Sequence, residues 1–333
     1  MLIIKTSSLG DVVHTLPALT DAAANVQDIQ FDWVVEEGFA QVPSWHATVN
    51  NVIPVALRRW RKHPLKARAS GEWARFKRDI RATDYDAVID AQGLLKSAWL
   101  CRYTRGERYG LDKQSAREPL ASRFYQHKIH VPKGQHAVER TRQLFAAALG
   151  YAVPGTLGEY QIDRQRLPQS PHQGDYLLFC HGTTWPTKHW PEAYWCELAR
   201  LLASSGLKIL LPWGNDVECQ RAQRIAETGS HVEVLPRSTL SQLASIIGEA
   251  RAVVSVDTGL AHLTAAMATP NITLYGPTDP GLVGTYGAHQ SHLLAKNYPS
   301  QKAAGVEPQV FAPLTPDIVF AQLNERLALE RSR

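Results

Sequence analysis

Short apolar runs alternate with amphipathic stretches along the first half of the chain. The runs are rich in β-branched residues and bounded by turn residues, which is the pattern of buried strands. Strands are predicted at residues 2–5, 31–35, 52–55 and 87–90, and helical spacing occupies 12–24, 93–102 and 136–149. Because strands that alternate with helices pair in parallel and carry helices on both faces, this half predicts an α/β domain.

The periodicity lapses near residues 151–175, where three prolines stand among polar residues, and then restarts. Such a stretch between two periodic regions is typical of a linker. Beyond it, strands are predicted at 176–180, 207–211, 232–235, 252–256 and 271–275, and helices at 191–204, 216–227, 240–248 and 260–267. The second half therefore repeats the α/β pattern of the first.

The two periodic regions predict two doubly wound, Rossmann-like domains joined by a hinge. We assign residues 1–165 to the first domain and 166–315 to the second, and we expect the ligand site in the cleft between them. An amphipathic stretch at 316–333 predicts a closing helix that could pack back on the first domain. The expected fold class is α/β.

Composition supports a globular protein of the cytoplasm. At 333 residues, with 44% hydrophobic and 20% charged residues, the chain can build two ordinary cores. Its apolar runs are shorter than a membrane span, and the start, MLIIK, reads as a buried strand rather than a signal peptide. The four cysteines include no CxxC pair and the histidines no HExxH, so we expect reduced thiols and no metal.

The net charge of +5 is unevenly distributed. Residues 58–81 hold ten Lys or Arg against two acidic residues, a net of +8, so the rest of the chain carries −3. A local field of this kind points to an anionic partner.

The first candidate site is KTSSLGD at residues 5–11, which runs from the first strand into a helix. A short turn of small residues there directs backbone N–H groups toward a ligand. The alternative is that Ser8 and Asp11 form a capping box and serve only the helix end. If Asp11 is catalytic, its position at a helix start makes it a weak base, which suits a proton that leaves late.

The second candidate is VVSVDTGLAH at residues 253–262, where a buried strand ends in a tight turn before a helix. Gly259 allows close approach of a ligand to the backbone, and the helix start favours phosphate. His262 lies one helical turn after Thr258, although a histidine in such a place is often purely structural.

The third candidate joins HGTT at residues 181–184 to KHWP at 188–191. Hydroxyls, backbone amides and the cation of Lys188 are the groups that a diphosphate needs when no metal shields it. The alternative is a helix cap with a solvated lysine. Glu218, behind Pro212-Trp213-Gly214, could hold sugar hydroxyls, or it could be a surface helix residue.

Two common motifs of other families do not fit. No GxGxxG follows a predicted strand, which argues against a dinucleotide site. Asp84-Tyr85-Asp86 resembles a metal-binding DxD, but it stands at the start of a predicted strand rather than at its end.

Several longer segments form a recognisable set: KTSSLGDVVHTLPAL at 5–19, DAQGLLKS at 90–97, AREPLAS at 116–122, KHWP at 188–191, SVDTGLAHLTAA at 255–266 and NITLYGPTDPGL at 271–282. Together they closely resemble the bacterial lipopolysaccharide heptosyltransferases, from residue 1 to about 290. DTGLAHL and GPTDP are the specific segments, while FDWVVEEGFA at 31–40 and RRWRK at 58–62 favour members that add the first heptose.

The resemblance implies the GT-B fold and transfer with inversion, without metal or other cofactor. The implied donor is ADP-L-glycero-β-D-manno-heptose, bound by the second domain, and the implied acceptor is a Kdo residue of Kdo-lipid A. Asp11 becomes the general base on the Kdo hydroxyl. The groups implied around the donor diphosphate are Lys188, Thr183, Thr184, Thr258, Gly259 and His262, with Glu218 and Asp257 on ribose or heptose hydroxyls. Lys188 and the helix start at 258–259 would stabilise the departing ADP in place of Mg²⁺.

On the same resemblance the first domain binds the acceptor, and its basic segment meets the phosphates and carboxylates of the headgroup. The implied acceptor contacts are Ser8, Gly10, Arg58, Arg59, Arg61, Lys62, Lys96 and Arg117. Because that acceptor is embedded in a membrane, we expect peripheral contact with the cytoplasmic face of the inner membrane. We also expect the protein to be a monomer.

Two other functions are compatible with parts of the pattern. A nucleotide-sugar epimerase or another transferase on the same scaffold would consume a nucleotide-sugar without a lipid acceptor. A non-enzymatic binder of nucleic acid or anionic membrane would act through residues 58–81 and would have no nucleotide pocket. That segment resembles no known nucleic-acid module, so we expect no nucleic-acid partner.

Overall fold

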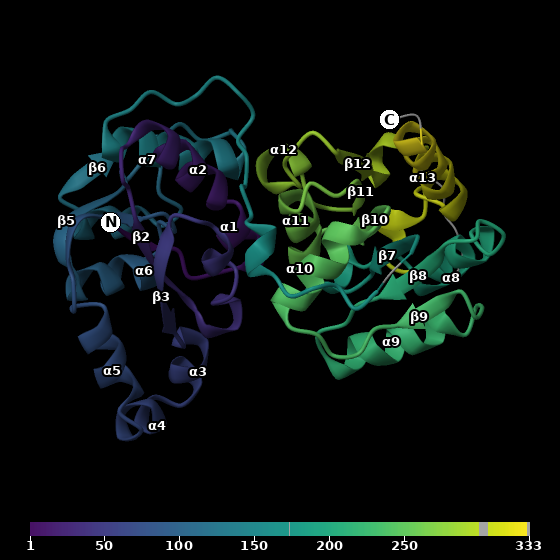
Figure 1. Cartoon of the computed structure of the whole chain (residues 1–333), viewed down its shortest axis with the longest axis horizontal. Coiled ribbons are helices and arrows are strands. Elements are labelled where there is room, and N and C mark those ends of the chain that lie inside the picture. The colour runs from purple at the N-terminus through teal and green to yellow at the C-terminus, as the bar shows by residue number, and fades with distance from the viewer. Residues whose placement is uncertain (173, 300–305, 332–333) are drawn as a thin grey trace. The chain divides into compact units, whose positions relative to one another are not determined.

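The computed structural model describes residues 1–172, 174–299 and 306–331. The chain divides into two compact units, Met1–Arg166 and Leu167–Arg333. Each contains one six-stranded parallel sheet with helices on both faces (Figure 1). The α/β fold with two Rossmann-like sheets, expected from the alternation of strands and helices, is confirmed. Among the described helices, none combines the length and apolar character that crossing a bilayer requires.

The first sheet has the strand order β3-β2-β1-β4-β5-β6. Its strands are β1 Leu2–Ile4, β2 Phe31–Glu36, β3 Val49–Val55, β4 Asp84–Asp90, β5 Arg105–Leu111 and β6 His127–Ile129. Its helices are α1 Leu9–Val13, α2 Leu16–Asn25, α3 Leu57–Lys62, α4 Pro64–Ala69, α5 Glu72–Asp79, α6 Leu95–Leu100 and α7 Ala137–Leu149. This order is that of dinucleotide-binding sheets, and it reverses between β1 and β4.

Several elements of the first unit differ from expectation. The single helix predicted at 12–24 is two helices, because Pro17 lacks an N–H and occupies the first turn of α2. Strand β5 was not predicted because its first residues, RGER, are charged or lack a side chain, and the first three are exposed. Helices α3, α4 and α5 were not predicted because their dense positive charge hides the apolar spacing.

The second sheet has the order β12-β11-β10-β7-β8-β9, which is the same arrangement and reverses between β7 and β10. Its strands are β7 Tyr176–Cys180, β8 Lys208–Leu211, β9 Val232–Val234, β10 Ala252–Val256, β11 Asn271–Tyr275 and β12 Gln290–Leu294. Its helices are α8 Glu192–Leu201, α9 Asp216–Ala226, α10 Leu240–Glu249, α11 Gly259–Ala266, α12 Pro280–Val283 and α13 Pro316–Arg331. The five strands expected here are present. β12 was missed because only Leu293 in it is buried.

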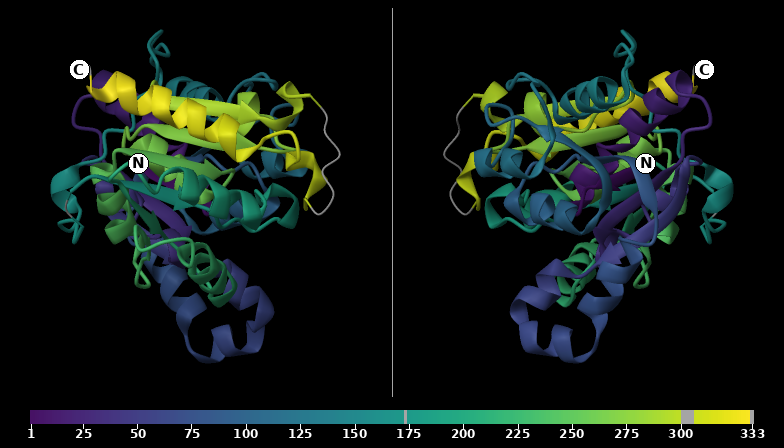
Figure 2. Two further views of the ribbon diagram at one scale, coloured as in Figure 1. Left: turned by 90° about the vertical axis from the view of Figure 1, so that its right-hand side faces the viewer. Right: turned by 90° about the vertical axis from the view of Figure 1, so that its left-hand side faces the viewer.

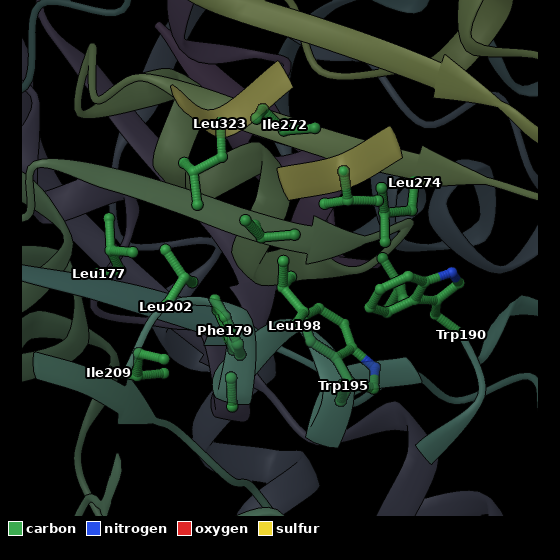
Figure 3. Close-up of a cluster of buried hydrophobic side chains, with 14 of the residues drawn as sticks. Leu177, Phe179, Trp190, Trp195, Leu198, Leu202, Ile209, Ile272, Leu274 and Leu323 are labelled. Atoms are coloured by element: carbon green, nitrogen blue, oxygen red, sulfur yellow. The ribbon is translucent and has the colours of Figure 1, made fainter. Parts of the chain in front are cut away.

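The core of the second unit lies between its sheet and the helices α8, α9 and α13. Strand residues Leu177 and Phe179 meet Trp190 and Trp195 in a cluster of fully buried side chains (Figure 3). Leu323 of α13 belongs to the same cluster, and Figure 2 shows this helix lying along the strands. The apolar face of α13 packs on its own unit, and the return of residues 316–333 to the first domain stays a prediction.

A buried arginine joins two helices of the first unit. Arg142 of α7 is 1% exposed, and its guanidinium pairs with Asp21 of α2, with Nε to Oδ2 at 2.6 Å. It also bonds the carboxylate of Glu139 and the backbone oxygens of Pro154 and Thr156. The arginine thereby fixes α7, α2 and the segment that follows α7 to one another.

Replacing Arg142 with alanine leaves the Asp21 carboxylate buried without its cation, which costs about 3–5 kcal/mol in comparable cases. We expect that loss in the free energy of unfolding of the first unit, measured by urea titration. The control is Arg105→Ala, which removes an exposed pair with Asp84 at 3.7 Å and should cost less than about 1 kcal/mol. Equal effects of the two substitutions would contradict this account of Arg142.

Candidate active site

Both sheets reverse their strand order at one point, and the candidate motifs follow the strands on either side of it. Residues 5–11 follow β1 and residues 91–93 follow its neighbour β4. In the second unit, residues 181–184 follow β7 and residues 257–259 follow its neighbour β10. Ligands of such sheets bind at the carboxyl ends of the strands at this reversal, because the flanking helices leave toward opposite faces.

In the second unit, Asp257 connects two of the predicted motifs. Its carboxylate is 2.5 Å from Nζ of Lys188, and only 9% of its side chain is exposed. The hydroxyl of Thr183 donates to the backbone oxygen of Asp257 at 3.0 Å. Lys188 keeps 25% of its side chain exposed, so its ammonium group is held in place and still faces solvent. The strand ends thus join a cation, a hydroxyl and a carboxylate.

Helix α11 begins beside this group. Thr258 is its N-cap in an extended conformation, its hydroxyl makes no capping bond, and the first turn holds no acidic residue. The first backbone N–H groups of a helix carry a partial positive charge that favours an anion. His262 lies one turn later and is 7% exposed, so it is a largely buried part of this helix. Thr184, also predicted for the site, is exposed.

Glu218 reaches the same edge from helix α9. A Cβ added to Gly182 would lie 2.7 Å from the carboxyl carbon of Glu218, so the carboxylate lies directly over this glycine. The backbone N–H of Gly214 donates to Glu218 Oε2 at 2.7 Å. Glu218 is therefore an oriented carboxylate beside the β7 loop.

A network behind this edge was not found from the sequence. Arg221 of α9 donates to Nδ1 of His189 at 2.5 Å and lies 3.5 Å from a carboxylate oxygen of Glu192. Burial, followed by the charge of Arg221, lowers the pKa of His189, which keeps the ring neutral and able to accept. The pair holds the segment that carries Lys188 against α9. The available signals were the adjacency of Lys188 and His189 and the one-turn spacing from Glu218 to Arg221.

In the first unit, Asp11 caps the start of helix α1 and is also partly exposed. Its Oδ2 accepts the backbone N–H of Ser8 at 2.7 Å and the Ser8 hydroxyl at 2.9 Å. The capping interaction that was weighed against catalysis is thus present. The side chain is nevertheless 42% exposed, and the buried ammonium of Lys5 lies 3.7 Å from Oδ1. A carboxylate held at a strand end beside a cation remains reachable from solvent.

Lys96 lies at the same edge, on α6. Its ammonium donates to the hydroxyl of Ser7 at 2.9 Å, and burial, followed by the charge of Arg58, lowers its pKa. Gln92 accepts the backbone N–H groups of Thr6 and Ser7, at 3.0 and 3.1 Å, and so ties the loop after β1 to the loop after β4. Ser8 is exposed, whereas Gly10 is buried inside α1.

Arg117 is exposed on a segment tied to the same edge. The neighbouring Glu118 donates its backbone N–H to the oxygen of Gly93 at 3.2 Å. Arg117 therefore stands near the end of β4, as its predicted role as an acceptor contact requires.

Helices α3, α4 and α5, residues 57–79, form the helical arm that carries most of the basic segment. Glu36, at the end of β2, accepts the backbone N–H of Arg58 at 3.0 Å. Glu36 is 6% exposed, and burial raises its pKa. This carboxylate was missed in the sequence, although it ends a strand next to β1.

Arg59, predicted as an acceptor contact, pairs with two carboxylates of its own unit. Its guanidinium bonds both carboxylate oxygens of Glu37, at 3.0 and 2.9 Å, and also Glu72 at 3.0 Å. It therefore anchors the arm, while Arg58, Arg61 and Lys62 are exposed. Within the described part of the chain, no group of three or more His, Cys, Asp or Glu could hold a metal ion.

Known proteins resemble the chain over most of its length. Residues 73–310 match the family model described as glycosyltransferase family 9 (heptosyltransferase). The chain is 57% identical to lipopolysaccharide heptosyltransferase 1 of Pseudomonas aeruginosa, over 88% of this chain and 83% of the relative. The structure of E. coli heptosyltransferase WaaC with ADP has a TM-score of 0.90 at 52% identity, covering 98% of this chain and 99% of that chain. WaaC with ADP-2-deoxy-2-fluoro heptose gives 0.86 at 52% identity, covering 97% and 98%.

His181, which follows β7, is fully buried, and burial lowers its pKa to about 3 from 6.5. The unfolded chain then binds a proton that the folded chain does not, so stability is lost as the pH falls from about 6.5 toward about 3. Between about pH 7 and about pH 5 we expect the unfolding free energy to fall by about 2 kcal/mol more than in His181→Gln. Urea titrations of both proteins at both pH values measure this difference. An equal fall in unfolding free energy for the wild type and for His181→Gln would contradict it.

Proposed function

The chain belongs to glycosyltransferase family 9, the heptosyltransferases, and we propose that it transfers L-glycero-D-manno-heptose from ADP-heptose to a Kdo residue of Kdo-lipid A. The transfer builds the inner core of lipopolysaccharide. We infer inversion at the anomeric carbon and no need for a metal ion. The observation that carries the proposal is the group of Lys188, Asp257 and Thr183 beside the start of α11.

This group has the chemistry that a leaving diphosphate needs. Breaking the bond between the anomeric carbon and the phosphate oxygen leaves negative charge on ADP. In our proposal Lys188, the hydroxyls of Thr183 and Thr184, and the backbone amides after Thr258 receive that charge. Such preorganised donors stabilise the developing charge more than water does, because they need no reorientation during the reaction. His262 supports the same helix start.

Two carboxylates are left for the sugar hydroxyls of the donor. Glu218 is oriented over Gly182 by the amide of Gly214, and Asp257 stands beside Lys188. A carboxylate accepts hydrogen bonds from ribose or heptose hydroxyls. In the proposal these residues set the position of the donor, and Lys188 acts on its phosphates.

Asp11 is the proposed general base. Its carboxylate takes the proton of the attacking Kdo hydroxyl, the hydroxyl oxygen bonds the anomeric carbon, and ADP leaves from the opposite face. Lys5 and Ser8 hold the Asp11 carboxylate in place. A carboxylate suffices as the base where bond breaking to the leaving group is advanced before the proton moves.

Around Asp11, the proposed acceptor contacts include Ser8, Gly10, Lys96 and Arg117, with the exposed cations of the arm on the headgroup charges. The acceptor would be met at the cytoplasmic face of the inner membrane by a monomer in peripheral contact. The ligand cleft that joins the donor and acceptor edges stays a prediction of the sequence. So does the division of labour between residues 1–165 and 166–315.

Asp11→Asn should abolish most turnover and leave ADP affinity unchanged, since asparagine keeps an acceptor for Ser8 but cannot take a proton. General bases typically contribute about 10²–10⁴-fold, and we expect a loss of that size in kcat. The measurement is ADP release from ADP-heptose with Kdo-lipid A, with a chelator present throughout. If the wild type shows no turnover in the presence of the chelator, metal independence is overturned. A variant that keeps most of its kcat would remove Asp11 from the role of base.

Lys188→Ala should weaken both ADP binding and the rate of transfer. A charge-assisted hydrogen bond contributes about 1.5–3 kcal/mol, so calorimetry should record roughly 10- to 100-fold weaker ADP binding. The matched control is Lys208→Ala, at the exposed start of β8, where binding should be unchanged. If Lys188→Ala binds ADP as the wild type does, the ion pair with Asp257 is structural and the diphosphate lies elsewhere.

A further inference from the structure

The outer end of the helical arm presents an apolar side chain to solvent. Leu65 of α4 is 84% exposed, more than any other exposed large hydrophobic residue among those described. Ala67, two positions on, is buried. Because each helical residue turns about 100°, Leu65 and Ala69 project from the side of α4 opposite to Ala67. Figure 1 places α4 at the end of the arm, with α3 and α5 between it and the sheet.

Exposed basic residues flank this apolar side chain in the sequence. The exposed basic residues of α3 and α4 nearest to it in sequence are Arg61, Lys62, Lys66 and Arg68. No acidic residue occurs between residues 57 and 71. The next carboxylate, Glu72, is already bonded to Arg59 and to the indole N–H of Trp60. The end of the arm is therefore a positive surface with leucine on it.

Aromatic contacts and ion pairs anchor the helical arm to the rest of the first unit. Trp73 stacks on Trp99 of α6, with ring centres 5.3 Å apart, and Trp60 meets Trp73 edge to face at 5.4 Å. Arg59 adds its bonds to Glu37 at the base of the arm and to Glu72 within it. A single exposed leucine is ordinary on a protein surface. One on an anchored projection among four cations has the composition of an interfacial membrane contact.

We propose that the end of the arm, residues 61–69, docks on an anionic lipid bilayer, with Leu65 entering the interfacial region and the surrounding cations on lipid phosphates. The proposal rests on the proposed function, because a lipid-embedded acceptor gives the enzyme a reason to reach a membrane. Charge complementarity selects the partner, since a polybasic surface is attracted to anionic leaflets and leucine favours their apolar boundary.

Sedimentation of the full chain with vesicles tests the proposal. Wild type should bind vesicles that contain phosphatidylglycerol much more tightly than vesicles of phosphatidylcholine alone. Leu65→Ser should weaken binding to the anionic vesicles by about tenfold, from the loss of apolar transfer. Lys66→Gln with Arg68→Gln should weaken it by about 25-fold, roughly fivefold per cation. The control is Leu157→Ser, another exposed leucine of the first unit, which should bind as wild type.

Transfer assays separate docking from chemistry. With a water-soluble, deacylated Kdo acceptor, Leu65→Ser should keep the wild-type kcat/KM, and with Kdo-lipid A in anionic vesicles it should lose about tenfold. Equal binding of wild type to both vesicle types, or unchanged binding of Leu65→Ser, would overturn the docking proposal. So would an equal loss on the soluble acceptor. Absence of transfer by wild type to either acceptor would instead overturn the proposed function, while the vesicle measurements would still decide docking.

Discussion

A parallel sheet places the ends of all its strands along one edge, and in both units the strand order reverses once along that edge. The reversal puts the ends of β1 and β4 side by side in one unit, and those of β7 and β10 in the other. Helices that leave toward opposite faces open a space there, so side chains on these strand ends meet a ligand rather than a helix. Lys188 contacts Asp257, and Lys96 contacts Ser7, because each motif or its partner follows such a strand. The other contacts of the candidate site depend on these adjacent strand ends.

Charge at these edges is compensated locally. Asp257 is largely buried against Lys188, and the buried ammonium of Lys5 faces Asp11. Buried charges without partners would cost several kcal/mol each, so the pairing is a condition of folding as well as of function. It also leaves Asp11 and Lys188 partly exposed, each beside an opposite charge. In the proposed transfer, Asp11 acts on the acceptor hydroxyl and Lys188 on the leaving diphosphate.

The sequence predicted the sheets where strands are buried on both faces, as in β7, β10 and β11, because their apolar runs are continuous. It failed for β5 and β12, in which only Gly110, Leu111 and Leu293 are buried. Candidate residues that the structure brings together, such as Thr183 and Asp257, lie directly after predicted strands. Glu36 was missed, although it directly follows the predicted strand at 31–35. The contact of Arg221 with His189 was also not predicted, because it depends on how α9 packs against the loop that carries His189. A single sequence gives no sign of which side chains meet in that way. Arg59 illustrates the same point, since its pairing with Glu37 and Glu72 could not be predicted from the sequence.

Helix α9 carries two side chains with different tasks, one turn apart. Glu218 lies over the loop after β7, and Arg221 holds the residue next to Lys188. In our proposal, the carboxylate that binds the donor sugar and the lysine that binds its phosphates are therefore both positioned by this one helix. Glu192 of α8 pairs with both Arg221 and Arg224, so the packing of α8 against α9 bears on the position of this helix. If the proposed donor site is correct, a change of nucleotide-sugar specificity is therefore constrained by how α9 packs against α8.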